Sequence, residues 1–315
     1  MKYILLFLLI LSSVFAKDMM EPSFSLKASG SVVDMLYKND LLYVATDSSC
    51  VDIFKYKEKE PIKKIELPKI TDFAGDEMES KIYSVDEIDG KILILSQDEH
   101  GYRRVDIYAN DKLEHIFTQK DMLSISKAKF LDKDNIIFAD LGSSLSSYNI
   151  TKKSYNYTTQ VSHGKFSDFC LDEQKKQIVI ADESGELKIH NTKDGKFIKK
   201  LSGKNLDNVF EVDCKNSTIA TAGQDRKVVI YKPLDSFIKE SGFLVYSAAL
   251  SPSAKLLAYS SDEQNNATLV DLVTKKTIRV LTGNKMNISK MVFINEDELV
   301  IGSDSNTINI YKEIK

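Results

Sequence analysis

Few side chains in this sequence have the types and spacings that catalysis requires. The four histidines, at positions 100, 115, 163 and 190, show no metal-type spacing with one another or with a cysteine. No Gly-x-Ser-x-Gly nucleophile elbow and no phosphate-binding Gly-rich loop is present. His190 stands where other repeats of the chain carry Tyr, so we interpret it as a packing residue. The sequence therefore predicts no catalytic residue, no metal site and no cofactor.

Paired carboxylates are the strongest catalytic alternative. Asp225 and Asp304 occupy equivalent turns of two repeats, and carboxylates facing one channel would suit a glycosidase, or a metal-dependent lactonase or lyase. Asp residues in such turns commonly accept hydrogen bonds from their own backbone. We favour this local role, because every repeat needs such a turn.

The three cysteines are Cys50, Cys170 and Cys214. An odd number does not describe a disulfide framework, and no two lie close enough for a zinc knuckle. Cys170 and Cys214 fall near the inner strands of neighbouring repeats, where a bridge is conceivable. The favoured interpretation is three small buried hydrophobic residues, because free Cys is commonly buried.

A short strand-like segment recurs along the whole chain. It appears at 51–54, 105–108, 145–148, 187–190, 228–231, 267–270 and 308–311. The intervals between the last residues are 54, 40, 42, 41, 39 and 41. A period near 40 with strand-like units is typical of a β-propeller.

Each period divides into short antiparallel strands. The expected strands are 166–171, 177–181, 186–190 and 196–201 in one repeat; 208–213, 217–222 and 227–231 in the next; and 246–250, 255–260, 267–271 and 276–281 in the third. Four such strands make one propeller blade, so the chain is predicted to be all-β with seven blades.

Two further segments complete the predicted ring. Residues 23–28 are strand-like, and we expect them to pair as the outer strand of blade seven, because an open sheet edge promotes aggregation. The alternative is a disordered leader. The 54-residue interval contains an insertion, 68–80, between blades one and two. In this topology the insertion shares one end of the ring with the turn 98–104.

This end of the ring is the predicted partner-binding surface. Tyr and Arg supply much of the binding energy at protein interfaces, and acidic groups of the insertion are expected to pair with the Arg residues. The alternative is a solvated loop with weak internal ion pairs. The proposed partner-binding residues are Asp72, Phe73, Asp76, Glu77, Met78, Glu79, His100, Tyr102, Arg103 and Arg104.

The N-terminus indicates an exported protein. Residues 1–16 combine Lys2, an apolar run at 3–11, and Val14 and Ala16 before a cleavage site, which is typical of a signal peptide. The apolar run is too short for a spanning helix, which needs roughly 20 residues. We therefore expect a single mature domain, 17–315, in the periplasm and without stable membrane insertion. The net charge of −3 gives no reason to expect nucleic acid as a partner.

Two turn-plus-strand segments, 222–231 and 302–311, resemble the second half of a WD40 repeat. The chain has no Trp, and the Trp-Asp pair is replaced by Tyr231-Lys232 or Val270-Asp271, so the repeats are degenerate. With its signal-like N-terminus, the chain resembles the NapL family of periplasmic proteins, encoded with some bacterial periplasmic nitrate reductases. The resemblance implies an accessory role in assembly or maturation of that reductase, with reductase subunits as partners. No catalytic residues of the family can be carried over.

The expected function is therefore a non-catalytic, periplasmic protein-interaction scaffold. The alternative is a periplasmic propeller enzyme with a channel-facing site, of the metal-dependent lactonase or lyase type.

Overall fold

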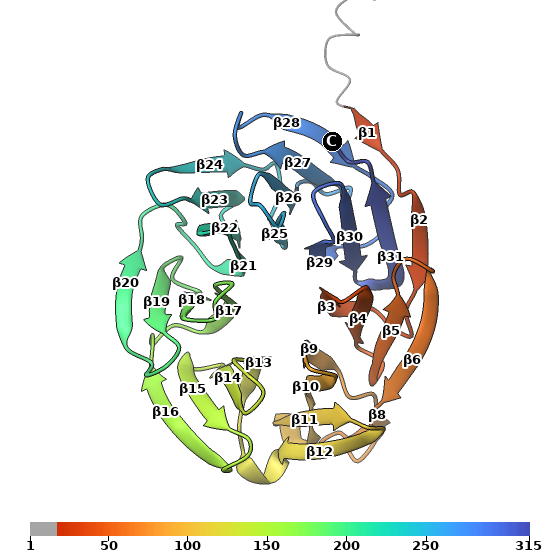
Figure 1. The fold of residues 1–315 in the computed structure, drawn as a ribbon, viewed down its shortest axis with the longest axis vertical. Coiled ribbons are helices and arrows are strands. Elements are labelled where there is room, and N and C mark those ends of the chain that lie inside the picture. Colours follow the sequence, from red (N-terminus) through yellow and green to blue (C-terminus); the bar gives the residue numbers. More distant parts are fainter. Residues whose placement is uncertain (1–17) are drawn as a thin grey trace, which may run out of the picture.

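Seven antiparallel sheets form a ring around a central channel (Figure 1). The computed structural model describes residues 18–315, so the predicted signal peptide, 1–16, lies outside the described residues. Six sheets have four strands, and that of blade six has a fifth. The all-β, seven-bladed architecture predicted from the repeats is confirmed.

The strands follow one another from the channel outward in each blade. Blade one contains β3 (Val32–Lys38), β4 (Leu41–Thr46), β5 (Cys50–Lys55) and β6 (Glu60–Glu66); blade two β9 (Ile82–Ile88), β10 (Lys91–Gln97), β11 (Arg103–Ala109) and β12 (Lys112–Phe117); blade three β13 (Ile125–Phe130), β14 (Asn135–Asp140), β15 (Ser144–Asn149) and β16 (Ser154–Gln160); blade four β17 (Phe166–Leu171), β18 (Gln177–Asp182), β19 (Leu187–Asn191) and β20 (Phe197–Leu201). Blade five contains β21 (Val209–Lys215), β22 (Thr218–Gly223), β23 (Lys227–Tyr231) and β24 (Ser236–Glu240); blade six β25 (Ala248–Leu250), β26 (Leu256–Ser260), β27 (Ala267–Asp271) and β28 (Thr277–Leu281); blade seven β29 (Ile288–Phe293), β30 (Glu298–Ser303), β31 (Ser305–Lys312) and β2 (Phe24–Lys27). The seven recurring segments of the sequence are the third strands.

The hydrophobic core lies between adjacent blades. Tyr43 and Ile53 of blade one, for example, share one buried cluster with Ile82 and Ile94 of blade two. Because each blade packs against a neighbour on both sides, its middle strands are apolar on both faces. This explains the continuous apolar run of β10, whose residues 92–95 are all buried.

The N-terminal segment closes the ring as predicted. β2 pairs antiparallel with β31, with Phe24 opposite Ile310 and Leu26 opposite Ile308. The preceding β1 (Met19–Met20) pairs parallel with β28 of blade six, which the sequence did not predict. The segment therefore contacts both blades six and seven, as its course in Figure 1 shows.

A disulfide joins Cys170 of β17 to Cys214 of β21. The preference for three free cysteines was therefore wrong for this pair, whereas Cys50 is free and buried as expected. The two residues lie on the innermost strands of neighbouring blades, with their Cα atoms 5.7 Å apart, within the range that a disulfide spans. Their separation of 44 residues, close to one repeat, places them side by side in the ring.

The strand order gives the ring two distinct faces. The insertion face carries the blade-to-blade connections and the turns between second and third strands. The opposite face carries the turns between first and second strands and between third and fourth strands.

Candidate functional site

The insertion 68–80 forms a hairpin that is anchored at its base. Its two short strands, β7 (Ile70–Thr71) and β8 (Glu77–Met78), pair antiparallel. Ile70 is buried, and the backbone N–H of Ser80 donates to Ser49 Oγ at 2.7 Å. The base is thus fixed against blade one. The tip projects into solvent, where Phe73 is 83% exposed.

The hairpin tip lies beside the second-to-third-strand turn of blade two, as predicted. This turn contains η1 (Glu99–Gly101), where His100 adopts a left-handed conformation with φ of 57°. The rings of Phe73 and His100 are 6.0 Å apart. Arg103 lies 4.2 Å from the centre of the Tyr83 ring and donates to the carbonyl oxygen of Gly101 at 2.7 Å. Arg103 therefore supports the turn that presents His100.

The acidic residues of the insertion do not pair with these Arg residues, which corrects the predicted ion pairing. Asp72 accepts hydrogen bonds from the backbone N–H groups of Ala74 and Asp76 at 2.8 and 2.9 Å. Glu77 and Glu79 pair instead with Lys69, at 3.6 and 3.3 Å. Short-range partners within the loop satisfy these acids, because its two strands bring them together.

Arg104 is turned into blade two. Its Nε lies 3.1 Å from Asp106 Oδ2, and both side chains are buried. Side chains alternate between the two sides of a strand, so Arg104 must point away from the side that Arg103 occupies. Of the ten predicted partner-binding residues, the insertion face exposes six: Phe73, Asp76, Glu77, Met78, Glu79 and His100. Asp72, Tyr102 and Arg103 are half-buried, and Arg104 is buried.

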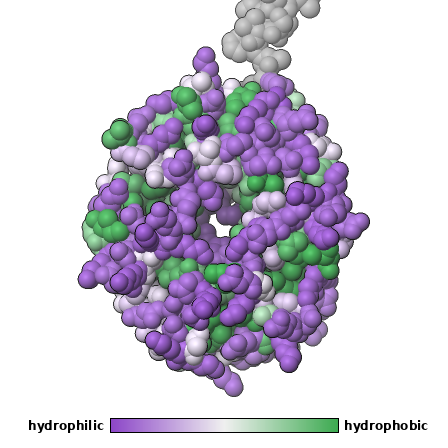
Figure 2. Space-filling model, viewed as in Figure 1, coloured by the Kyte–Doolittle hydropathy of each residue, from purple (hydrophilic) through white to green (hydrophobic). Residues whose placement is uncertain are grey.

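The central channel holds a second group of polar residues, which the sequence analysis did not identify. Most innermost strands contain a register shift near their start, and the residue that follows the shift is polar in six blades. We call these residues the channel ring: Asp34, Ser84, Lys127, Asp168, Glu211 and Lys290. Figure 2 shows the open channel bordered mainly by hydrophilic side chains. A charged residue near the start of the first strand in successive repeats was the sequence signal for this ring.

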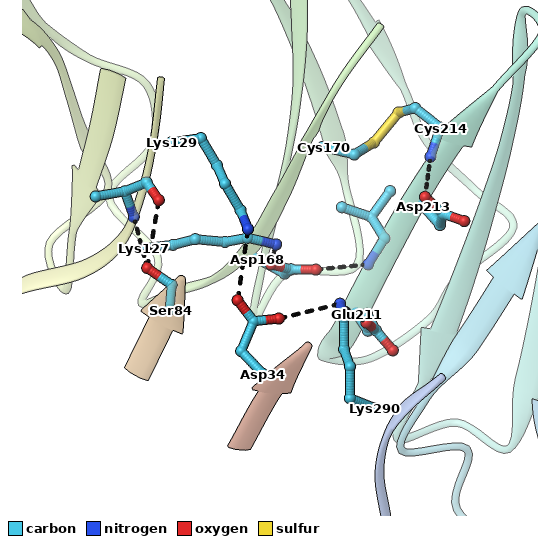
Figure 3. Close-up of polar contacts among 12 residues, drawn as sticks. Asp34, Ser84, Lys127, Lys129, Asp168, Cys170, Glu211, Asp213, Cys214 and Lys290 are labelled. Carbon is cyan, nitrogen blue, oxygen red and sulfur yellow. Dashed lines mark hydrogen bonds and ion pairs between the residues drawn. A yellow bond between two sulfur atoms is a disulfide. The ribbon is translucent and has the colours of Figure 1, made fainter. Parts of the chain in front are cut away.

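The charged members of the channel ring pair across blades (Figure 3). Lys127 binds Asp168, and Lys290 binds Glu211. Lys290 also lies 3.9 Å from Asp34. Lys129, two residues after Lys127 on the same side of β13, lies 3.4 Å from Asp34. Three lysines thus face three carboxylates inside the channel.

The same carboxylates bind the backbone of the next blade. Asp34 accepts from the N–H of Val85 at 3.1 Å, and Asp168 accepts from that of Val212 at 3.0 Å. Glu211 accepts from that of Ala248 at 3.1 Å. Since the hydrogen-bonding capacity of these groups is engaged, the channel ring is suited to holding blades together rather than to acid–base chemistry.

The geometry favours the charged forms of Asp34 and Lys290, whereas burial raises the pKa of Glu211 above its usual value. Burial alone would raise the pKa of Asp34, but the ammonium groups of Lys129 and Lys290 outweigh it and hold the pKa below its usual value. Burial alone would lower the pKa of Lys290, whereas the carboxylates of Glu211 and Asp34 raise it above its usual value.

Acid should therefore remove the stability that Asp34 contributes. Because the folded pKa of Asp34 is lowered, this contribution is present above the unfolded pKa, about 3.9. This contribution is lost as the pH falls toward the pKa that Asp34 has in the folded protein. We expect Asp34→Asn to be less stable than the wild type at pH 6, with a gap that narrows below pH ~4. Urea unfolding between pH 6 and 2.5 measures this, and a gap independent of pH would contradict it.

Of the remaining candidates for chemistry, Asp225 and His190 have structural partners, and Asp304 is exposed. Asp225 accepts from the backbone N–H groups of Leu206 and Lys227, at 2.8 and 3.1 Å, which is the favoured backbone role. His190 is buried and its Nδ1 lies 2.8 Å from the carbonyl oxygen of Gly195, in agreement with a packing role. Within residues 18–315 no cluster of His, Cys, Asp or Glu is arranged to hold a metal ion. Within the same range, no helix has the length and apolar character needed to span a bilayer.

Comparisons with known proteins identify the fold. No family model matches the chain, and no curated protein matches its sequence. Among solved structures, the chain is similar to the β-propeller domain of Cps50 (Swd1) from Myceliophteria thermophila, with a TM-score of 0.74. The similarity covers 92% of this chain and 98% of that domain, at 12% sequence identity. At this identity it shows a WD40-like propeller fold and no more.

Proposed function

We propose that the protein is a non-catalytic interaction scaffold of the periplasm, and that a partner protein docks on the insertion face. The observation that carries this proposal is the pair of exposed apolar residues of the insertion, Phe73 at its tip beside His100 and Met78 on β8. Propeller blades provide a rigid support, and recognition in such folds resides in loops held by the support. The anchored base of the hairpin meets this condition, because it holds the tip in one place.

The disulfide supports export. Disulfides form and persist in oxidising compartments such as the bacterial periplasm, and are rare in the cytosol. The Cys170–Cys214 bridge suits such a compartment. It is consistent with the signal peptide that the sequence predicts for residues 1–16, whose cleavage would leave a mature domain beginning near β1.

As partner we propose the subunits of periplasmic nitrate reductase, with an accessory role in their assembly or maturation. The support is the resemblance of the chain to the NapL family, which combines an export signal with degenerate WD40-like blades. Nucleic acid is not a proposed partner, because acidic residues outnumber Lys and Arg. Nitrate-reductase genes beside the gene for this chain would support the proposal.

Replacing Phe73 with Ser should weaken capture of nitrate reductase subunits at least tenfold. A central exposed aromatic residue commonly contributes about 2 kcal/mol or more to binding, which exceeds the free energy of a tenfold change. The temperature of thermal unfolding should change little, because the aromatic side chain of Phe73 is exposed to solvent. Surface plasmon resonance against the purified reductase measures the affinity.

Phe197→Ser is the matched control, since Phe197 is also exposed but lies on the outer strand of blade four. Equal capture by wild type, Phe73→Ser and Arg103→Ala would reject the insertion face as the docking site. Arg104→Ala is unsuitable for this test, because it would leave Asp106 buried with less of its counter-charge.

A further inference from the structure

The channel opens on the opposite face into a cavity of about 290 Å³. Its walls are formed by the C-terminal ends of several innermost strands and by the turn between β17 and β18 of blade four. Lys175 and Lys215 stand at this mouth, and Phe169 and Met291 line its apolar wall. Its size is just below the usual range for small-molecule sites, about 300 to 1,000 Å³, which suits a ligand of few atoms.

Three carboxylates line this cavity, and each has a backbone donor; Glu211, a member of the channel ring, also binds Lys290. Asp86 accepts from the N–H of Phe130 at 2.8 Å. Asp213 accepts from the N–H groups of Leu250 and Cys214, at 2.8 and 2.9 Å. Backbone N–H groups therefore stabilise Asp86 and Asp213, and neither forms a direct ion pair within residues 18–315.

The lysines of the mouth are less fully engaged. Lys175 donates from Nζ to the carbonyl oxygen of Phe130 at 2.7 Å, and within residues 18–315 it forms no ion pair. Lys215 likewise forms no ion pair within the same described range. An ammonium group has three donors and no acceptor. The unused hydrogen-bonding capacity of the mouth is therefore mostly donor capacity, which a negatively charged ligand would satisfy.

Two further features favour an anion at Lys175. Burial lowers the pKa of Lys175, and the ammonium groups of Lys38 and Lys129 lower it further, while Asp86 opposes them. An anion beside Lys175 would offset the repulsion that these ammonium groups exert on it. The mouth also contains Phe169 and Met291, which would contact an apolar body attached to the anion.

The disulfide joins the two segments that carry the mouth lysines. Cys170 is near the end of β17, five residues before Lys175, and Cys214 directly precedes Lys215 at the end of β21. Cys170 and Cys214 both line the cavity. The bridge therefore joins the end of β17, whose following turn carries Lys175, to the end of β21, which carries Lys215, and limits their relative movement before any ligand binds.

We propose that this channel mouth is a binding site for a small organic anion, a carboxylate on an apolar body, which Lys175 and Lys215 hold and the Cys170–Cys214 bridge preorganises. The site lies on the face opposite the insertion, so the ligand and the protein partner would bind independently. The proposal does not depend on the identity of that partner.

Benzoate is a suitable probe, with benzamide as its neutral counterpart of the same shape. Amide chemical shifts of the oxidised, isotope-labelled protein would be followed as each probe is added. We expect saturable benzoate binding that shifts residues around 170–175 and 211–215, and affinity for benzamide lower by about tenfold, since a charge-assisted hydrogen bond is lost. Absence of saturable benzoate binding, or equal affinity for benzamide, would overturn the proposal.

Lys175→Met should weaken benzoate binding by about tenfold for the same reason. Lys199→Met, an exposed lysine on the outer strand of blade four, is the matched control and should leave the affinity unchanged. Unaltered affinity in Lys175→Met would overturn the assigned site.

The double variant Cys170→Ser and Cys214→Ser should bind benzoate several-fold more weakly, because the bridge no longer joins the two segments. Unaltered benzoate binding would overturn the role of the bridge. The spectrum of each unliganded variant reports whether it remains folded.

Discussion

Replacing Lys290 with Met is expected to lower the free energy of unfolding by about 3 kcal/mol, because it leaves the buried Glu211 without its cation and Asp34 with Lys129 alone. Lys290 binds Glu211 and lies 3.9 Å from Asp34, and all three side chains are largely removed from solvent. Met fills a similar volume, so the loss reports the missing charge rather than a cavity. Urea unfolding at pH 7 measures the effect.

Two further variants separate charge from packing. Lys276→Met, at an exposed site at the edge of blade six, should change the free energy of unfolding by less than about 0.5 kcal/mol. Adding Glu211→Gln to Lys290→Met removes one orphaned carboxylate and should restore part of the loss, because an unpaired buried charge costs more than a neutral amide. Equal losses in Lys290→Met and Lys276→Met would contradict a stabilising role for the channel ring.

Deleting residues 18–28 is expected to cost more than about 4 kcal/mol, or to prevent folding at 37 °C. The deletion removes the strand that pairs with β31, together with the buried side chain of Leu26. Loss of one buried Leu alone typically costs about 2 to 5 kcal/mol. The deletion also exposes the edge of β31, where another chain can pair. Thermal unfolding and light scattering of the mature protein test both consequences.

Point variants of the same strand give a finer test. Leu26→Ala should lower the free energy of unfolding by about 2 to 4 kcal/mol, whereas Lys27→Ala, on the exposed side of β2, should change it little. If the deletion variant kept wild-type stability, the propeller would not depend on the pairing of β2 with β31 for its closure.

Periodicity allowed much of the fold to be predicted from the sequence. The third strands carry alternating or continuous apolar residues at nearly constant spacing, so both their positions and the number of blades could be predicted. β2 was predicted from Phe24 and Leu26, an apolar pair with no other assignment. β1 was missed, because two residues carry no periodic pattern and Met19 is exposed.

The insertion shows where such prediction fails. Its position beside the turn of blade two follows from strand order alone, and the contact of Phe73 with His100 confirms it. The pairing of its acids depends on which side chains point toward each other. Arg104 faces the interior of its blade, and Lys69 within the loop provides the nearer cation for Glu79.

The sequence by itself determined the repeat, the strand order and therefore the two faces of the ring, because these depend on local patterns and on connection lengths. Only the tertiary structure decided which residues meet in the channel. Circular closure brings equivalent positions of different blades, about 40 residues or more apart in the chain, within bonding distance. Lys290 and Glu211, and Cys170 and Cys214, become partners for this reason. A linear pattern does not contain the angle between blades, so it cannot predict the Lys290–Glu211 pair, and it left the Cys170–Cys214 bridge as one of two alternatives.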